Sequence, residues 1–135
     1  MRVRTTFVLR FALVATLIGF GGMAEAASAV GAGPLYGGPF STGVAFVCRV
    51  FNYGLVSVTL SERQIWDNAG NAVLVSSDSC NVALGVGKSC AFSAPISGNL
   101  AFSCRVVAGG SNPKISGVAE IQDVTFSVLA RIPFR

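Results

Sequence analysis

Histidine is absent from all 135 residues of this chain. The chain therefore lacks the side chain that proteins most often use as a general base near neutral pH and as a metal ligand. Charge is also sparse, because Asp, Glu, Lys and Arg make up 12% of the residues whereas hydrophobic residues make up 52%. This composition excludes a disordered chain and a highly charged nucleic-acid-binding arm.

Residues 1–26 predict a secretory signal peptide. Three arginines precede an apolar run over residues 11–20, and small residues follow over 24–29, which is the order of a cleavable export signal. Two glycines end the run before the length of about 20 apolar residues that a membrane span needs. We therefore expect cleavage before Ala27, or as late as after residue 29, with no stable membrane insertion afterwards. The predicted location is secreted or periplasmic.

Removal of residues 1–26 leaves seven basic and five acidic side chains, a net charge of +2. These charges are dispersed along the chain, whereas binding to nucleic acid depends on clustered contacts with phosphates. We expect no nucleic-acid partner.

Residues 27–43 predict a flexible or extended lead-in to a domain over 44–135. Five glycines and two prolines stand between positions 30 and 43, and both residue types oppose helix and regular strand. An alternative hypothesis is that segment 30–42 is donated to a neighbouring subunit as an added strand.

From residue 44 onward, apolar and polar residues alternate with a period of two, which is typical of β-strands with one buried face. Turn signals recur every 8 to 12 residues, and no stretch of eleven residues shows a helical stripe. The pattern predicts an all-β, antiparallel sandwich of seven or eight short strands. The expected strands cover residues 44–50, 56–65 with a bulge near 62–64, 72–75, 90–94, 100–106, 115–122 and 124–132, the last with Val124, Phe126, Val128 and Ile132 on one face.

Four cysteines in an exported chain indicate two disulfides, for which three pairings exist. Cys80 and Cys90 bracket a turn, so their closure is local. Cys48 and Cys104 stand in mid-strand at inward positions, as a bridge between two sheets requires. We predict the pairs Cys48–Cys104 and Cys80–Cys90. The spacings lack a Cys-x-x-Cys pair and there is no histidine, so no zinc site or other cofactor is expected.

An inward cysteine pair 56 residues apart in a run of short strands resembles the immunoglobulin-type sandwich. The order of strands and turns over residues 44–132 is similar to small exported bacterial domains of immunoglobulin-like type. Phe102 stands where immunoglobulin domains carry a corner tyrosine, so that hydrogen bond cannot form. Trp66 follows Cys48 by 18 residues, later than the core tryptophan of those domains. The resemblance implies an architecture and no activity.

Arg49 and Arg105 are candidate binding residues because the alternation points both of them outward. Together with Arg131 they would form an anion-binding patch only if the strands of Arg49 and Arg105 share a sheet. The alternative is that all are solvated surface arginines.

A second hypothesis is an aromatic platform for a glycan, formed by Trp66 and Tyr53 together with Tyr36. The competing interpretation places Trp66 in the core and the two tyrosines in loop packing.

No reactive constellation of side chains is recognisable in the chain. The five-residue stretch 67–71 supplies one carboxylate, which is too few for a calcium loop. A carboxylate-pair hydrolase would have to use two acids from a small set: Asp67, Asp78, Glu120 and Asp123. We expect no enzyme.

The predicted function is that of an exported, non-catalytic module for binding or for structural interaction at a surface, with a protein or a glycan as partner. Strand edges and loops would carry recognition, and the candidate loops are Asn52–Gly54, Asp67–Asn71 and Gly109–Pro113. Two alternatives remain beside the hydrolase: an assembling surface subunit that donates segment 30–42, and a secreted protease inhibitor that uses the Cys80–Cys90 loop.

Overall fold

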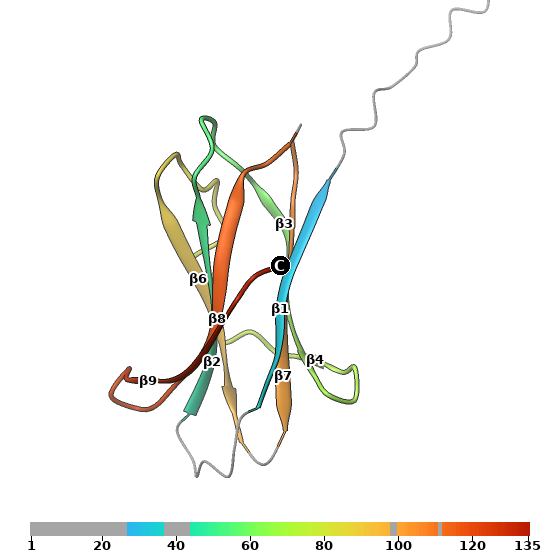
Figure 1. Cartoon of the computed structure of the whole chain (residues 1–135), viewed down its shortest axis with the longest axis vertical. Helices are drawn as coiled ribbons and strands as arrows, with labels where there is room; N and C mark the ends of the chain where they lie inside the picture. Colours follow the sequence, from blue (N-terminus) through green and yellow to red (C-terminus); the bar gives the residue numbers. More distant parts are fainter. Residues whose placement is uncertain (1–26, 37–43, 98–99, 111) are drawn as a thin grey trace, which may run out of the picture.

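The computed structural model describes residues 27–36, 44–97, 100–110 and 112–135 (Figure 1). The predicted signal peptide and residues 37–43 lie outside the described residues. Within the described ranges, nine strands form two antiparallel sheets that pack face to face, so the prediction of an all-β sandwich is confirmed. The four-stranded sheet has the order β1 (Ser28–Tyr36), β7 (Ala101–Ala108), β3 (Leu60–Asp67), β4 (Ala72–Val73). The five-stranded sheet has the order β5 (Ser77–Asp78), β6 (Ser89–Ile96), β2 (Val44–Asn52), β8 (Ile115–Gln122), β9 (Val128–Pro133).

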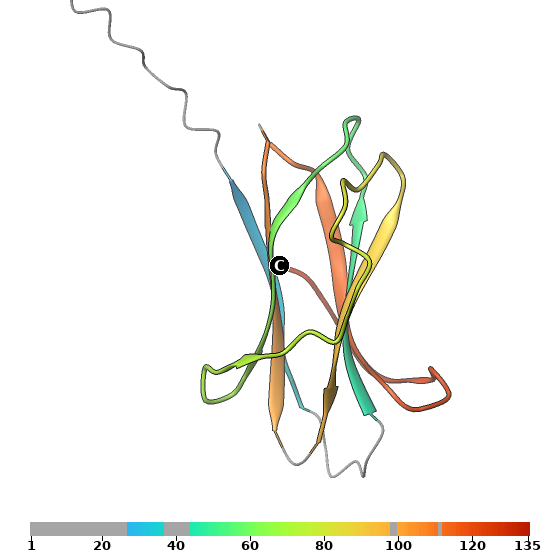
Figure 2. The same ribbon diagram turned by 180° about the vertical axis from the view of Figure 1, so that it is seen from behind.

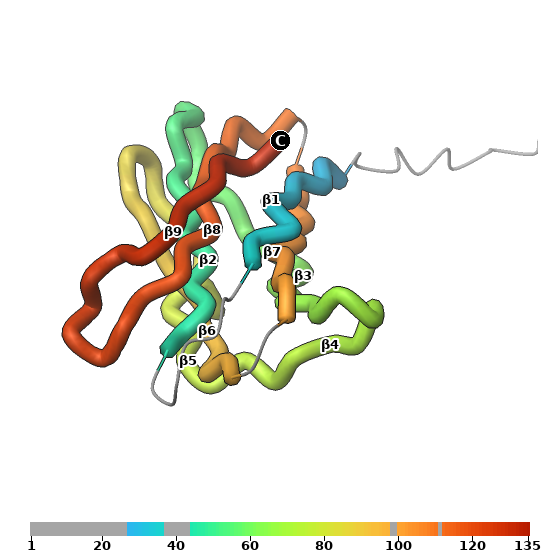
Figure 3. The backbone as a smooth tube through the Cα atoms, turned by 60° about the horizontal axis from the view of Figure 1, so that its bottom comes forward, coloured from blue at the N-terminus to red at the C-terminus, as the bar shows by residue number. Residues whose placement is uncertain are grey.

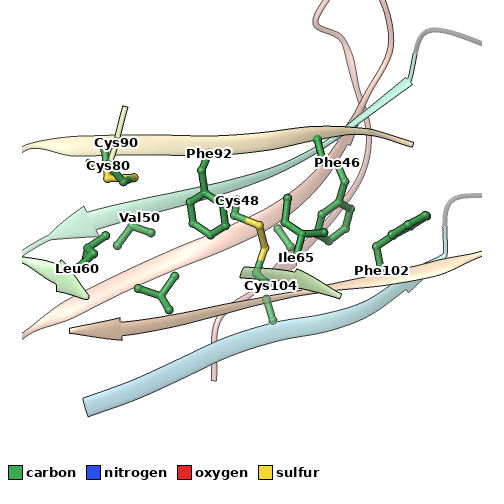
Figure 4. Close-up of a cluster of buried hydrophobic side chains, with 14 of the residues drawn as sticks. Phe46, Cys48, Val50, Leu60, Ile65, Cys80, Cys90, Phe92, Phe102 and Cys104 are labelled. Carbon is green, nitrogen blue, oxygen red and sulfur yellow. A yellow bond between two sulfur atoms is a disulfide. The ribbon is translucent and has the colours of Figure 1, made fainter. Parts of the chain in front are cut away.

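The core lies between the two sheets and follows from the two-residue period. On β2, Phe46, Cys48 and Val50 point inward and are almost fully buried, while Arg49 points outward. The ring of Phe46 meets that of Phe102 on β7 with the centroids 5.7 Å apart (Figure 4). Each large apolar side chain buried in this way stabilises the fold by about 1.5–3 kcal/mol.

Both predicted disulfides are confirmed. Cys48–Cys104 joins β2 to β7 across the core, with 6.1 Å between the Cα atoms, and Figure 4 shows the bridge crossing between the layers. Cys80–Cys90 ties the segment after β5 to the start of β6, with a Cα separation of 5.1 Å. Two disulfides indicate an oxidising compartment.

The order of the strands departs from the immunoglobulin arrangement at two positions. In that arrangement the first strand pairs with the first cysteine strand, and the last strand pairs with the second. Here β1 pairs with β7, the strand of Cys104, while β8 crosses to the other sheet and pairs with β2, the strand of Cys48. The first and last positions of the sandwich are thus exchanged, and β9 extends the five-stranded sheet by one strand.

The expectation that residues 30–43 oppose a regular strand is wrong for residues 30–36. They belong to β1, which pairs with β7 over most of its length (Figure 2). The glycines that argued against a strand allow close packing here: a Cβ atom on Gly33 would lie 2.6 Å from the Cβ of Ser103. The sandwich therefore begins at Ser28. Donation of segment 30–42 to a neighbour stays a prediction.

The stretch after Asn52 also differs from the expected strand over residues 56–65. Val58 makes an isolated bridge with Leu84, and the regular strand begins only at Leu60. A register shift between Leu60 and Glu62 changes which residues face inward. The parity of Ile65 predicted a bulge near residues 62–64, and the structure has one slightly earlier, between Leu60 and Glu62.

The expected strand over 124–132 is wrong at its start. The Asp123 carboxylate accepts hydrogen bonds from the backbone amides of Thr125 and Ser127, which folds residues 123–127 into a turn. Val124 and Phe126 therefore lie on the surface, whereas the alternation predicted that they face the core.

Candidate binding surfaces

Three loops meet at one end of the sandwich, at the top of Figure 1. We call this surface the loop end and define it as residues 53–59, 81–88 and 109–114, of which Ser111 lies outside the described residues. Backbone hydrogen bonds join the three: Tyr53 N donates to Lys114 O, Val58 and Leu84 exchange two bonds, and Gly109 N donates to Thr59 O. The loops form one surface.

Asn52 organises this end from beneath. Its side chain is fully buried and donates to the carbonyl oxygens of Val56 at 2.8 Å and Leu84 at 2.9 Å. Its Oδ1 accepts a bond from Gly54 N at 2.9 Å. Because one amide satisfies three backbone groups of two loops, it fixes the conformation of both.

The loop end exposes apolar side chains that the fold does not use. Leu55 is 93% exposed, Val56 68% and Tyr53 56%. They border a cavity of about 290 Å³ that Asn112 and Lys114 also line. The three loops contain Lys88 and Lys114 and no acidic residue, so this surface is apolar and weakly basic.

Two of the three predicted recognition loops, Asn52–Gly54 and Gly109–Pro113, meet at the loop end. The third, Asp67–Asn71, lies elsewhere, in the turn between β3 and β4. There the Asp67 carboxylate accepts bonds from the side-chain amide of Asn71 and from the backbone amides of Asn71 and Ala69. The Asn71 side chain, followed by these amides, lowers the pKa of Asp67. The carboxylate closes its own turn.

Arg49 and Arg105 lie on different sheets, so they form no common patch. Arg105 is 3.7 Å from Glu62 on the four-stranded sheet. Arg49 and Arg131 instead converge on Glu120 on the outer face of the five-stranded sheet, with nitrogen–oxygen distances of 3.1 and 2.6 Å. Two of the three arginines are thus brought together.

Glu120 is 1% exposed, although it stands on the outer face of its sheet. Gln122 also donates to it, at 2.6 Å. Burial alone would raise the pKa of this carboxyl, but the bonds from Arg49, Gln122 and Arg131 outweigh burial and lower it. Sequence reasoning missed this cluster. The cluster depends on the pairing of β8 with β2 and β9, which sets Glu120 opposite Val47 and Arg131 and which no local sequence pattern encodes.

The core position expected for Trp66 is wrong. Ile65 is the residue of β3 that points inward, paired with Cys104 and fully buried, so Trp66 faces outward and is half-buried. Tyr36 pairs with Ala101 and shares this outer face, separated from Trp66 by β7. Tyr53 lies at the loop end. The three aromatic residues therefore do not form one platform.

The Cys80–Cys90 loop, predicted to act as an inhibitor, is held to the sandwich near its middle by Leu84. Leu84 is buried and bonded to Val58, while Val82 and Val86 on either side of it are exposed. Use of the Cys80–Cys90 loop against a protease stays a prediction.

The acidic residues of the described chain all have structural contacts. Arg63 on β3 meets Asp78 on β5 at 2.7 Å, an ion pair that links the two sheets and that sequence reasoning missed. Glu62 and Glu120 contact arginines, and Asp67 and Asp123 fold turns. The hydrolase hypothesis would have to draw its two carboxylates from groups already engaged in this way.

Across the ranges that the structure describes, no helix has the length and hydropathy of a membrane span. Within the same ranges, no three Cys, Asp or Glu side chains cluster as metal ligands would.

Comparisons with protein-family models, with curated proteins and with solved structures give no match to this chain.

Proposed function

We propose that this chain is an exported, non-catalytic binding module that contacts a protein partner through the loop end. The signal-peptide pattern over residues 1–26 supports export. The two disulfides agree with a secreted or periplasmic location.

The observation that carries this proposal is the exposure of Leu55, Val56 and Tyr53 on loops that Asn52 holds in place. Contiguous exposed apolar side chains mark interaction sites in soluble proteins. A loop already ordered by buried hydrogen bonds loses little conformational entropy on binding, so more of the contact energy remains as affinity. Aliphatic side chains beside two lysines suit a protein surface with apolar and acidic groups.

Photo-crosslinking in the producing cells tests the proposal, with the crosslinker placed at Val56. The expected result is a discrete crosslinked partner that is lost when L55S is added. A crosslinker at Leu74, which is 87% exposed in the segment after β4, is the matched control and should not give that product. The same product from Val56 and Leu74, or none from Val56, would contradict the assignment.

A further inference from the structure

The hairpin between β8 and β9 projects from the body of the sandwich (Figures 1 and 3). Val124 is 70% exposed and Phe126 82% at its tip. Phe126 has a φ of 64°, a left-handed backbone conformation that residues other than glycine and asparagine rarely adopt. Its amide donates to Asp123 O, and the Asp123 carboxylate accepts three bonds from Thr125 and Ser127.

The turn therefore holds an aromatic side chain in solvent in a conformation that costs free energy. Strained residues that the surrounding bonds enforce tend to occur at functional sites.

A groove of about 400 Å³ lies at the base of this hairpin. The sheet side of the groove consists of Ala45, Val47 and Arg49 on β2 and Ser93 on β6, and the hairpin side of Gln122, Asp123, Val124 and Phe126. The same hairpin is thus both a projecting apolar element and one side of a groove that holds apolar and charged side chains.

We propose that two copies of the chain form a two-fold symmetric dimer in which each β8–β9 hairpin covers the groove of the other copy. A two-fold interface uses the same patch on both subunits, so the patch must be complementary to itself. This patch is complementary to itself in shape, because it holds both a projecting hairpin and a groove. It is also complementary in charge, since Arg49 and Asp123 line the same groove with opposite charges. A two-fold rotation can bring the positive side of one patch against the negative side of the other.

The area agrees with a specific dimer. The hairpin and the strand that follows it expose four large apolar side chains: Val124, Phe126, Val128 and Leu129. Covering them in both copies, with an equal area of the surface they contact, buries on the order of 1,500 Å², within the ~1,200–2,000 Å² of standard protein interfaces.

Sedimentation velocity of the oxidised, exported protein, from low micromolar to a few hundred micromolar, tests this dimer. We expect the wild type to approach twice the monomer mass. F126G should weaken dimerisation at least about 100-fold, because two buried aromatic side chains are lost per dimer. Glycine tolerates a positive φ, so this variant should keep the thermal midpoint of the isolated monomer, and loss of the dimer will not reflect unfolding. V124S should weaken the dimer as well.

L74S removes a side chain of similar exposure outside the groove and should leave the dimer unchanged. L55S should also leave it unchanged, which separates this site from the loop end. A wild type that stays monomeric at the highest concentration would overturn the proposal, and so would a dimer that persists in F126G.

Discussion

The Nε atom of Arg49 lies 3.1 Å from Oε2 of Glu120, and the carboxylate is buried whereas the arginine side chain is half exposed. Arg131 contacts the other carboxylate oxygen. A buried charge is tolerated when its hydrogen bonds are satisfied. The two arginines keep Glu120 ionised, and through it they connect β2, β8 and β9.

The stability of the fold should depend on the ionisation of Glu120. Its pKa is lowered in the folded state from an ordinary value of 4.5. Its contribution is therefore fully present above that value and lost as the pH falls through the lower folded pKa. In E120Q the fall of the thermal midpoint between about pH 6 and pH 3 should be smaller than in the wild type. Some fall should remain, because the pKa values of Asp67 and Asp123 are lowered too. Identical pH profiles for wild type and E120Q would contradict this role.

Removal of the Asn52 amide should destabilise the fold strongly. N52A removes the donor to the carbonyl oxygen of Val56 and the acceptor of the Gly54 amide, while the Leu84 carbonyl keeps its bond from Val58 N. Each buried unsatisfied group costs about 1–3 kcal/mol, so we expect a loss of about 3 kcal/mol in urea unfolding. Asn81 is exposed, and N81A should change stability by less than about 0.5 kcal/mol. Equal effects of the two variants would show that the amide does not organise the loops.

Gly117 should not tolerate a side chain. A Cβ atom there would overlap the carbonyl oxygen of Arg49 and lie 2.8 Å from the ring of Phe134. G117A should therefore cost about 1–3 kcal/mol through overpacking. G85A is the control, since a Cβ at Gly85 meets only the Lys88 side chain at 3.5 Å. Guanidinium unfolding of both variants measures the difference, and a G117A protein as stable as G85A would contradict the packing described.

The two disulfides should contribute unequally. Cys48–Cys104 closes a separation of 56 residues and Cys80–Cys90 one of 10. Restriction of the unfolded chain then gives about 4 kcal/mol for the first and about 3 kcal/mol for the second. C48A/C104A should also leave a cavity in the core, which increases the difference in stability between the two double variants. Unfolding of both variants measures this difference, and a C80A/C90A protein less stable than C48A/C104A would contradict the prediction.

Alternation and cysteine chemistry were enough to predict the sandwich and its disulfides. Inward positions such as Phe46 and Phe102 repeat every second residue, and a cysteine at an inward position on each of two strands can join two layers. The parity of Ile65 also revealed the bulge in β3.

The remaining features depend on contacts between distant residues. A Gly-Pro-rich composition opposes a strand in general, but at Gly33 the close approach of Ser103 requires a residue without a side chain. The apolar alternation at Val124 and Phe126 resembles a strand, yet a single carboxylate at Asp123 folds the chain there. The meeting of Arg49 and Arg131 at Glu120 required the strand order, which no local pattern encodes.

The placement of β1 beside β7 has a consequence for how the protein folds. Synthesis runs from the N-terminus, so β1 is made long before β7. Ala32 can pair with Cys104 only after β7 has been synthesised. Pairings between such distant segments slow folding, because chain entropy is lost before the contact stabilises anything. We therefore expect β1 to be among the last strands to pair in the sheet. Until it pairs, Val30 and Leu35 lack the core neighbours that bury them.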